Sequence, residues 1–265
     1  MKNQFIILLL LIAAPVFAMG QAPHLPGVIK LQNLVSAQLI QIDNATAQAA
    51  QDLTNTGLRG DGAGQVLNNL YNTVPSAVDI ATIDLKGNLL LIKPDKYQSY
   101  AGQNVSGQSH IAKIKKNDKP VMSRIFKTVE GFYATAIVFP VYSKHGKLSG
   151  YVSMVFKPDA LMGNIIQPYL SNMESVEAMI VQQDGRVIYS KDIMQIGKMT
   201  FSDPLYQPYP NLLNLAHRVT TQASGTGTYQ FPAGPGKATV NKMTEWTTVS
   251  LRDVEWRIIV SKTVN

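Results

Sequence analysis

The sequence predicts an α+β protein in which one long N-terminal helix carries two tandem modules, each a mostly antiparallel sheet flanked by helices. Apolar residues recur every three or four positions from Gly27 to about Thr54, which predicts a long helix with one buried face. Runs rich in aromatic and β-branched residues come in pairs joined by short polar turns, as in hairpins. The order of two strands, a loop with a helix, and three strands occurs twice, about 100 residues apart, which indicates two modules rather than a solenoid.

The N-terminus has the pattern of a secretory signal peptide over residues 1–18. Lys2 precedes an apolar run from Phe5 to Phe17, and the small residue Ala18 marks the expected cleavage site. Because the run is shorter than the roughly 20 residues that cross a bilayer as a helix, cleavage is favoured over a retained anchor. We therefore expect an exported chain that works in the periplasm or outside the cell.

The segment after the signal, residues 27–74, is predicted to contain a long helix and a short second helix. The long helix begins after Pro26 and ends at Gly57. The glycine-rich stretch 57–64 is expected to be a linker, and a second, shorter helix is expected over residues 65–72.

The first module is predicted over residues 75–157. It begins with a hairpin whose turn contains Gly87, followed by a polar segment and a short helix from Ser109 to Lys116. A strand is expected over 121–126. The long hairpin from Glu130 to Phe156 completes a sheet of about five strands.

A connecting helical segment, 158–177, leads to the second module, 178–265. Asp159, directly after a proline, is expected to cap the connecting helix. The second module again begins with a hairpin, here with an Asp-Gly turn at Gly185, and the loop at 196–199 corresponds to residues 100–104 of the first module. The remaining predicted elements are a helix over 211–220 and two closing strands over 244–251 and 255–260.

The composition excludes several classes of function. The chain has no cysteine, so disulfides, thiolate metal sites and a cysteine nucleophile are ruled out. The formal net charge of +7 comes from scattered basic residues, and without a basic stripe interleaved with aromatics we expect no nucleic-acid partner. The histidines lack metal-ligand spacing, and a G-x-S-x-G nucleophile elbow is missing. We therefore expect no metal, no cofactor and no enzymatic activity.

Short runs in both modules resemble one known family. In the first module they are Val78–Asp84 followed by Gly87, Lys119–Ser123, Phe139–Tyr142, Gly146 and Gly150. In the second module they are Asp184–Tyr189, Ser224–Gly227 and Glu255–Arg257. These runs are similar to the extracytoplasmic double Cache (dCACHE) sensor domains of chemoreceptors and sensor kinases. The resemblance spans nearly all of the mature chain. It implies two PAS-like Cache modules, a membrane-distal first module that holds a small ligand and a membrane-proximal second module.

The resemblance also implies how an amino acid would be held, and this chain departs from that pattern. In the amino-acid-binding branch, a Tyr/Arg/Trp-Tyr run before the pocket helix takes the carboxylate and an aspartate in the last strand takes the amine. This chain has neither arginine nor tryptophan in Ser106–Ile111, and it has Ser153 where the aspartate would lie. Because serine cannot supply the charge that pairs with an ammonium group, we expect a small-molecule ligand other than an amino acid.

The predicted ligand-binding residues line the first module between its sheet and the loop and helix. Arg124 shares a strand face with Phe126 and would hold a carboxylate bidentately, which makes a small organic anion a candidate ligand. Alternatively, Arg124 pairs with Glu130 and binds nothing. His110 would be a donor, a pH-sensitive contact or a residue of the helix surface. The full set is Gln108, His110, Arg124, Phe126, Glu130, Phe132, Tyr133, Tyr142 and Ser153.

The function expected from these observations is that of an exported sensor protein that binds a small molecule and takes part in signal transduction or chemotaxis. The sequence contains no second membrane helix and no kinase module, so its signal is expected to pass through a separate membrane receptor or kinase. The alternative is an interaction or structural module of the cell envelope with a vestigial pocket. The sequence leaves the identity of the ligand and the oligomeric state open.

Overall fold

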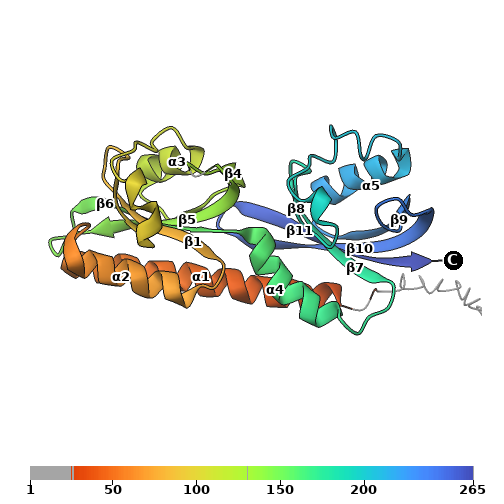
Figure 1. Cartoon of the computed structure of the whole chain (residues 1–265), viewed down its shortest axis with the longest axis horizontal. Helices are drawn as coiled ribbons and strands as arrows, with labels where there is room; N and C mark the ends of the chain where they lie inside the picture. The colour runs from red at the N-terminus through yellow and green to blue at the C-terminus, as the bar shows by residue number, and fades with distance from the viewer. Residues whose placement is uncertain (1–24, 26, 130, 265) are drawn as a thin grey trace, which may run out of the picture.

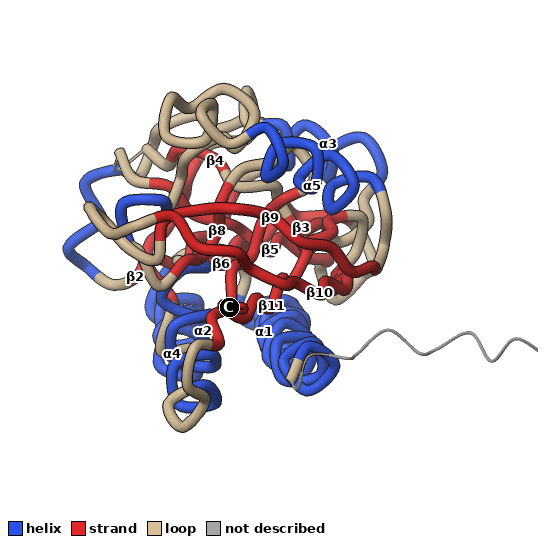
Figure 2. The backbone as a smooth tube through the Cα atoms, turned by 90° about the vertical axis from the view of Figure 1, so that its right-hand side faces the viewer, coloured by secondary structure: helices blue, strands red, loops and turns tan. Residues whose placement is uncertain are grey.

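The computed structural model describes residues 25, 27–129 and 131–264; the predicted signal peptide lies outside the described residues. The helices are α1 (Val28–Thr56), α2 (Gly60–Thr73), α3 (Ser109–Asn117), α4 (Pro158–Leu170) and α5 (Pro210–Thr221). Two antiparallel sheets lie side by side along α1, with α1, α2 and α4 on one face and α3 and α5 on the other (Figures 1 and 2). We call the first sheet with α3 the first module and the second sheet with α5 the second module. The predicted architecture, one long helix carrying two sheet modules, is confirmed.

Both modules share α1. Its buried residues recur with the predicted spacing, and Leu31, Leu39 and Leu53 are almost fully buried. The helix packs against β5 (Tyr133–Tyr142) of the first sheet and β10 (Thr239–Leu251) of the second (Figure 1). Near its middle, Asp43 accepts two hydrogen bonds from the Arg252 guanidinium, at 3.0 and 2.5 Å. One helix therefore holds the two modules together.

The second helix begins earlier than the sequence predicts. The expected linker extends to Gly64, whereas α2 already starts at Gly60. A glycine inside a helix costs about 1 kcal/mol relative to alanine. Burial of Ala63, Leu67 and Leu70 against the core outweighs that cost, which local propensity alone does not reveal.

The first sheet is antiparallel throughout, in the order β2-β1-β6-β5-β3, and β4 pairs with β5. The 3-10 helix η1 (Asp95–Tyr100) follows β2, and α3 covers the outer face of the sheet (Figure 1). The strands other than β5 are β1 (Ala77–Ile83), β2 (Leu89–Lys93), β3 (Val121–Met122), β4 (Phe126–Lys127) and β6 (Leu148–Phe156).

The strand predicted over 121–126 is broken into β3 and β4, so the expected face shared by Arg124 and Phe126 does not form. The Ser123 hydroxyl accepts an amide N–H of β5 at 2.9 Å, in place of a main-chain carbonyl. Two residues later, the Ile125 amide donates to the Gln182 side chain of the second module at 3.0 Å. Arg124, between these two bonds, is exposed. A contact between modules therefore interrupts the strand.

The second sheet has the order β8-β7-β11-β10-β9, which repeats the topology of the first. Two boundaries differ from the prediction. The N-cap residue of α4 is Lys157 rather than Asp159, and Pro158 lies in the first turn of the helix. Strand β10 starts five residues before the expected position 244. The 3-10 helix η2 (Ile193–Gln195) follows β8. The strands other than β10 are β7 (Val176–Gln182), β8 (Val187–Ser190), β9 (Gly225–Pro232) and β11 (Val254–Val264).

The internal repeat extends to individual hydrogen bonds. After the first hairpin of each module, the chain returns to the second strand in the same way. Gly102 N–H donates to the Leu89 carbonyl in the first module, and Gly197 N–H donates to the Val187 carbonyl in the second, both at 2.8 Å. The predicted correspondence of these two loops is confirmed.

The hydrophobic core has three parts. One cluster fills the space between the helices α1, α2 and α4 and both sheets, and it continues from one module into the other. Two smaller clusters lie on the outer faces, one under α3 and one under α5. Of the helices in the described chain, none combines the length and apolar character needed to cross a membrane.

Candidate functional site

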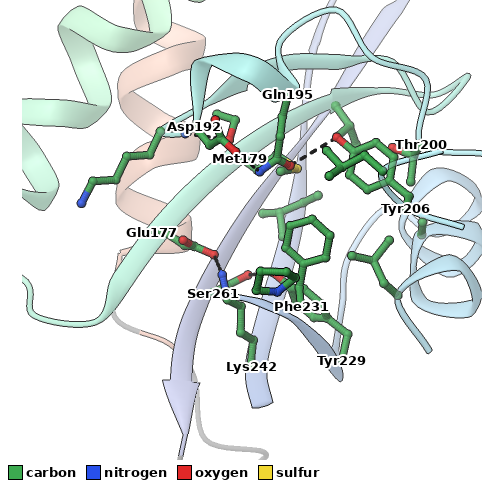
Figure 3. A pocket seen from close by; sticks show the side chains of 18 of the residues that line it. Glu177, Met179, Asp192, Gln195, Thr200, Tyr206, Tyr229, Phe231, Lys242 and Ser261 are labelled. Carbon is green, nitrogen blue, oxygen red and sulfur yellow. Dashed lines mark hydrogen bonds and ion pairs between the residues drawn. The ribbon is translucent and has the colours of Figure 1, made fainter. Parts of the chain in front are cut away.

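A cavity of about 570 Å³ lies on the outer face of the second sheet, under α5 (Figure 3). Its walls come from β7, β9, β10 and β11, from η2 and the loop after it, from α5, and from the turn 232–237 between β9 and β10. This volume falls in the range of about 300–1,000 Å³ that is typical of ligand pockets.

Two glycines of β9 allow close packing beside this cavity, Gly225 against β10 and Gly227 against α5. A Cβ atom at Gly225 would lie 2.4 Å from Cζ2 of Trp246, and one at Gly227 would lie 2.5 Å from Cδ1 of Leu215 on α5. Both distances are far below van der Waals contact, so only glycine fits. The Ser224–Gly227 run noted in the sequence therefore sets the spacing of the wall.

An apolar belt surrounds the middle of the cavity. The rings of Tyr206 and Phe231 stack with centroids 6.0 Å apart, and Tyr209 meets Phe231 edge-on at 5.0 Å. The side chains of this apolar belt that line the cavity are Met179, Val181, Leu205, Tyr206, Leu212, Leu215, Val219, Phe231 and Ile259. A ligand with an apolar body can be buried here.

The first polar group, which we call the lower pole, consists of Lys242, Glu177, Tyr229 and Ser261. Lys242 on β10 reaches across β11 and forms an ion pair with Glu177 on β7 (Figure 3). The Lys242 side chain is only 5% exposed, whereas that of Glu177 is 37% exposed. The charge of Lys242 is thus fixed inside the wall, and Glu177 is its outer partner.

The hydroxyl groups of the lower pole form a directed chain. Thr244 donates to the Val260 carbonyl at 2.9 Å, and Ser261 donates to Thr244 at 3.0 Å. Since a hydroxyl has one hydrogen, the 3.2 Å bond between Tyr229 and Ser261 must be donated by Tyr229. Burial, and secondarily the charge of Glu177, raises the pKa of Tyr229 above its ordinary value. Tyr229 is therefore a neutral phenol whose oxygen can still accept a hydrogen bond.

The second polar group, the upper pole, consists of Asp192, Gln195 and Tyr206. Tyr206 donates to Gln195 Oε1 at 3.2 Å, and Gln195 Nε2 donates to Asp192 Oδ2 at 3.2 Å. Asp192 Oδ1 accepts the Met194 amide at 3.1 Å and so caps η2. Burial, followed by the charges of Asp203 and Asp192, raises the pKa of Tyr206. Figure 3 shows Asp192 and Gln195 on one side of the belt and Lys242 and Ser261 on the other.

The first module holds a much smaller cavity, of about 40 Å³. Four of the nine predicted site residues line it: Gln108, His110, Phe126 and Ser153. His110 is 4% exposed, so its interpretation as a helix-surface residue is wrong; its ring lies 4.6 Å from that of Phe126. Burial lowers the pKa of His110 to about 4, and its Nδ1 has no hydrogen-bond partner among the described residues. The imidazole is therefore neutral at pH 7.

Four further predicted site residues, all within the described chain, do not line this cavity. Arg124 is exposed, and Tyr142 is 38% exposed near the end of β5. Tyr133 is 52% exposed, with the Arg186 guanidinium of the second module 5.3 Å above its ring. Phe132 packs against the outer cluster of the first module. Glu130 lies outside the described residues, so the proposed pairing of Arg124 with Glu130 stays a prediction.

Sequence reasoning missed the second-module cavity because the resemblance directed attention to the first module. A usable signal was the pair of charged residues, Glu177 and Lys242, within strands β7 and β10 of the second module. Such charges inside a sheet are costly unless they are paired, and they commonly mark a site. Among all the described residues, no group of three or more His, Cys, Asp or Glu side chains could hold a metal ion.

Known proteins resemble this chain in sequence or in fold. A family model described as "HK/GC/Chemotaxis protein-like, sensor domain" matches residues 37–158. The extracellular ligand binding receptor from Desulfohalobium retbaense DSM5692 is 30% identical, with a TM-score of 0.75 over 89% of this chain and 39% of that chain. The match to the sensor-domain model covers 122 of the 265 residues, and the fold is that of the double-Cache sensor domains. The chain spans 39% of the length of the Desulfohalobium receptor chain.

More distant structures share the double-Cache fold. The periplasmic sensory domain of the Campylobacter jejuni chemoreceptor Tlp1 is 13% identical, with a TM-score of 0.63 over 89% of this chain and 92% of that one. The ligand-binding domain of the Pseudomonas fluorescens chemoreceptor CtaA, in complex with L-isoleucine, is 15% identical, with a TM-score of 0.62 over 89% and 88%. At these identities the likeness shows the fold alone. None of the curated proteins matches the sequence significantly.

The expectation that the ligand is not an amino acid is corrected by these structures. CtaA has this fold and was solved with L-isoleucine and with L-serine. The premise also fails within the chain itself, since Asp79 on β1 lines the same small cavity as Ser153 on β6. A carboxyl group is therefore present there although residue 153 is a serine.

Proposed function

We propose that this double-Cache chain is an exported small-molecule sensor whose ligand occupies the second-module cavity and whose signal passes to a separate membrane receptor or kinase. The observation that carries the proposal is the difference in volume between the two cavities, about 570 against 40 Å³. A cavity of about 150 Å³ accommodates benzene, so the smaller cavity is too small for a metabolite.

Export and the absence of catalysis belong to the same proposal. The signal-peptide pattern of residues 1–18 supports export. The Desulfohalobium protein is described as an extracellular ligand binding receptor and the Tlp1 domain as a periplasmic sensory domain, which supports a binding role outside the cytoplasm. We propose that the chain binds its ligand without transforming it.

A ligand site in the first module, built from the predicted residues, stays a prediction. It would require Phe126 to move away from His110 and the segment after β3 to swing outward. The hydrogen bond from the Ile125 N–H to Gln182 Oε1 holds that segment to the second module and opposes the movement.

Thermal unfolding in the presence of a metabolite library tests the proposal. A ligand at 100 times its dissociation constant should stabilise the protein by about 2.7 kcal/mol, which for a chain of this size raises Tm by roughly 5–11 °C. Ala216→Phe, which fills the second-module cavity from α5, should abolish the shift. Ser153→Val, which fills the small cavity of the first module, should leave it unchanged.

The outcomes separate this proposal from the alternative. A shift that survives Ala216→Phe but disappears in Ser153→Val places the ligand in the first module and overturns the proposal. If no compound shifts Tm and an envelope protein is recovered by crosslinking, the chain is an interaction or structural module. The small volume of the first-module cavity favours that second candidate function.

A further inference from the structure

We propose that the second-module cavity recognises a short apolar peptide of two or three residues, with its carboxylate at the lower pole and its ammonium group at the upper pole. This inference rests on the proposed function, because it names the ligand class of the same cavity. Three features of the cavity carry it: its size, its two charged poles, and the apolar belt between them.

The size of the cavity favours a ligand larger than one amino acid. A cavity of about 150 Å³ accommodates benzene, a ring of six carbons. A single apolar amino acid would thus fill well under half of the 570 Å³ found here. Two or three residues together match the volume, and their apolar side chains can contact the belt.

The lower pole is suited to a carboxylate. Lys242 is buried, so it needs a negative partner at all times. In the structure that partner is Glu177, which is more exposed and can turn toward water. A ligand carboxylate can therefore replace Glu177 without leaving the buried ammonium unpaired. The accepting oxygen of Tyr229, nearby, can receive a peptide N–H.

The upper pole is suited to an ammonium group. Asp192 is held by two neutral donors, the Met194 amide and the Gln195 side chain. Within the described chain no lysine or arginine forms an ion pair with it, so its negative charge is not neutralised by a neighbour. A cationic group would be held here by a charge-assisted hydrogen bond. The exposed side chain of Ile193, next to Asp192 in the cavity lining, can cover the bound cationic group.

The apolar belt between the two poles favours a ligand whose carboxylate and ammonium groups lie at opposite ends. Figure 3 shows Phe231 between Gln195 of the upper pole and Lys242 of the lower pole. A ligand with one charged end only would leave the other pole solvated by trapped water. A free amino acid would place both charges next to each other. A short peptide places them at its two ends, with apolar side chains in between.

Four probes test the inference on the full chain by isothermal titration calorimetry: Leu-Leu, its C-terminal amide, its N-acetyl derivative, and L-leucine. Leu-Leu should bind at least tenfold more tightly than each of the other three. In Lys242→Met the preference for the free carboxylate should disappear while the preference for the free amine remains. In Asp192→Asn the preference for the free amine should disappear, since asparagine can still cap η2 but carries no charge.

Two further variants control for the possibility that Lys242→Met impairs folding. Lys198→Met breaks the ion pair of Lys198 with Asp203, which lies in the same module but outside the cavity lining, and should not change any of the four affinities. If Lys242→Met does not fold, the double variant Lys242→Gln with Glu177→Gln removes the charge and keeps a hydrogen-bonded pair; it should show the same loss of carboxylate preference.

The results distinguish this inference from the proposed function. If the four probes bind equally, or none binds while another compound gives a shift that Ala216→Phe abolishes, the peptide assignment is overturned and the cavity remains the ligand site. If Leu-Leu binding is unaffected by Ala216→Phe, the proposed function fails as well.

Discussion

Replacing Asp43 with alanine tests the contact that joins α1 to the second module. The Asp43 side chain is 11% exposed, and its carboxylate receives two hydrogen bonds from Arg252, whose guanidinium also lies 5.2 Å from the centre of the Phe139 ring of the first sheet. Hydrogen bonds to charged groups are worth about 1.5–3 kcal/mol each. The Arg252 side chain is one-third exposed, so water can solvate it after the substitution, and we expect a net loss at the lower end, about 2–3 kcal/mol.

Urea unfolding, followed by circular dichroism, measures this loss. With a slope of about 3 kcal/mol per molar, the midpoint should fall by roughly 0.7–1 M. The matched control is Asp95→Ala, which removes a carboxylate that is 82% exposed and paired with Lys93; it should cost less than about 0.5 kcal/mol. Equal losses in the two variants would refute the reasoning that Asp43 holds the modules to the long helix.

Three further predictions concern burial and close contact. Burial lowers the pKa of His110 from 6.5 to about 4, so the unfolded chain binds more protons than the folded chain between these pH values. The His110 contribution to the free energy of unfolding should be complete above pH 6.5 and fall by up to about 3 kcal/mol toward pH 4. Urea titrations at pH 7.5 and 4.5 should show that His110→Leu loses this part of the pH dependence. Trp246 and Trp256 are equally buried, but of the two only Trp246 donates its indole N–H to a main-chain carbonyl, at 3.1 Å. Trp246→Phe should therefore lower the free energy of unfolding by about 1–2 kcal/mol more than Trp256→Phe does. Equal losses in the two variants would contradict the hydrogen-bond argument. Gly225→Ala should destabilise the protein by about 1–3 kcal/mol in thermal unfolding, whereas Gly107→Ala, with open space at its Cβ, should be close to neutral.

Much of the fold could be predicted from the sequence because its signals are local. The apolar stripe of α1, the hairpin at Gly185 and the repeated order of elements are all visible in residue spacing, and the structure contains them. The family resemblance added the relation between the modules. Local signals failed at α2, where tertiary packing outweighs the low helix propensity of glycine, and at residues 123–125, where the second module takes the amide that would have continued the strand.

The candidate site could be predicted only in part, because its geometry depends on contacts between distant segments. Gln108, His110, Phe126 and Ser153 do converge, but they pack so closely that only about 40 Å³ remains between them. Cavity volume is a result of side-chain packing and is not encoded in any short motif. Lys242 and Glu177 are 65 residues apart in sequence and meet only through the order of β10, β11 and β7.

The central claim is that the second module holds the ligand. It is tested most directly by a crystal structure of the full chain with the compound that raises its Tm most. The account predicts electron density for that compound under α5, with an anionic group on Lys242 and apolar atoms against Phe231. Density beside His110 in the first module, with the second-module cavity holding only water, would contradict it.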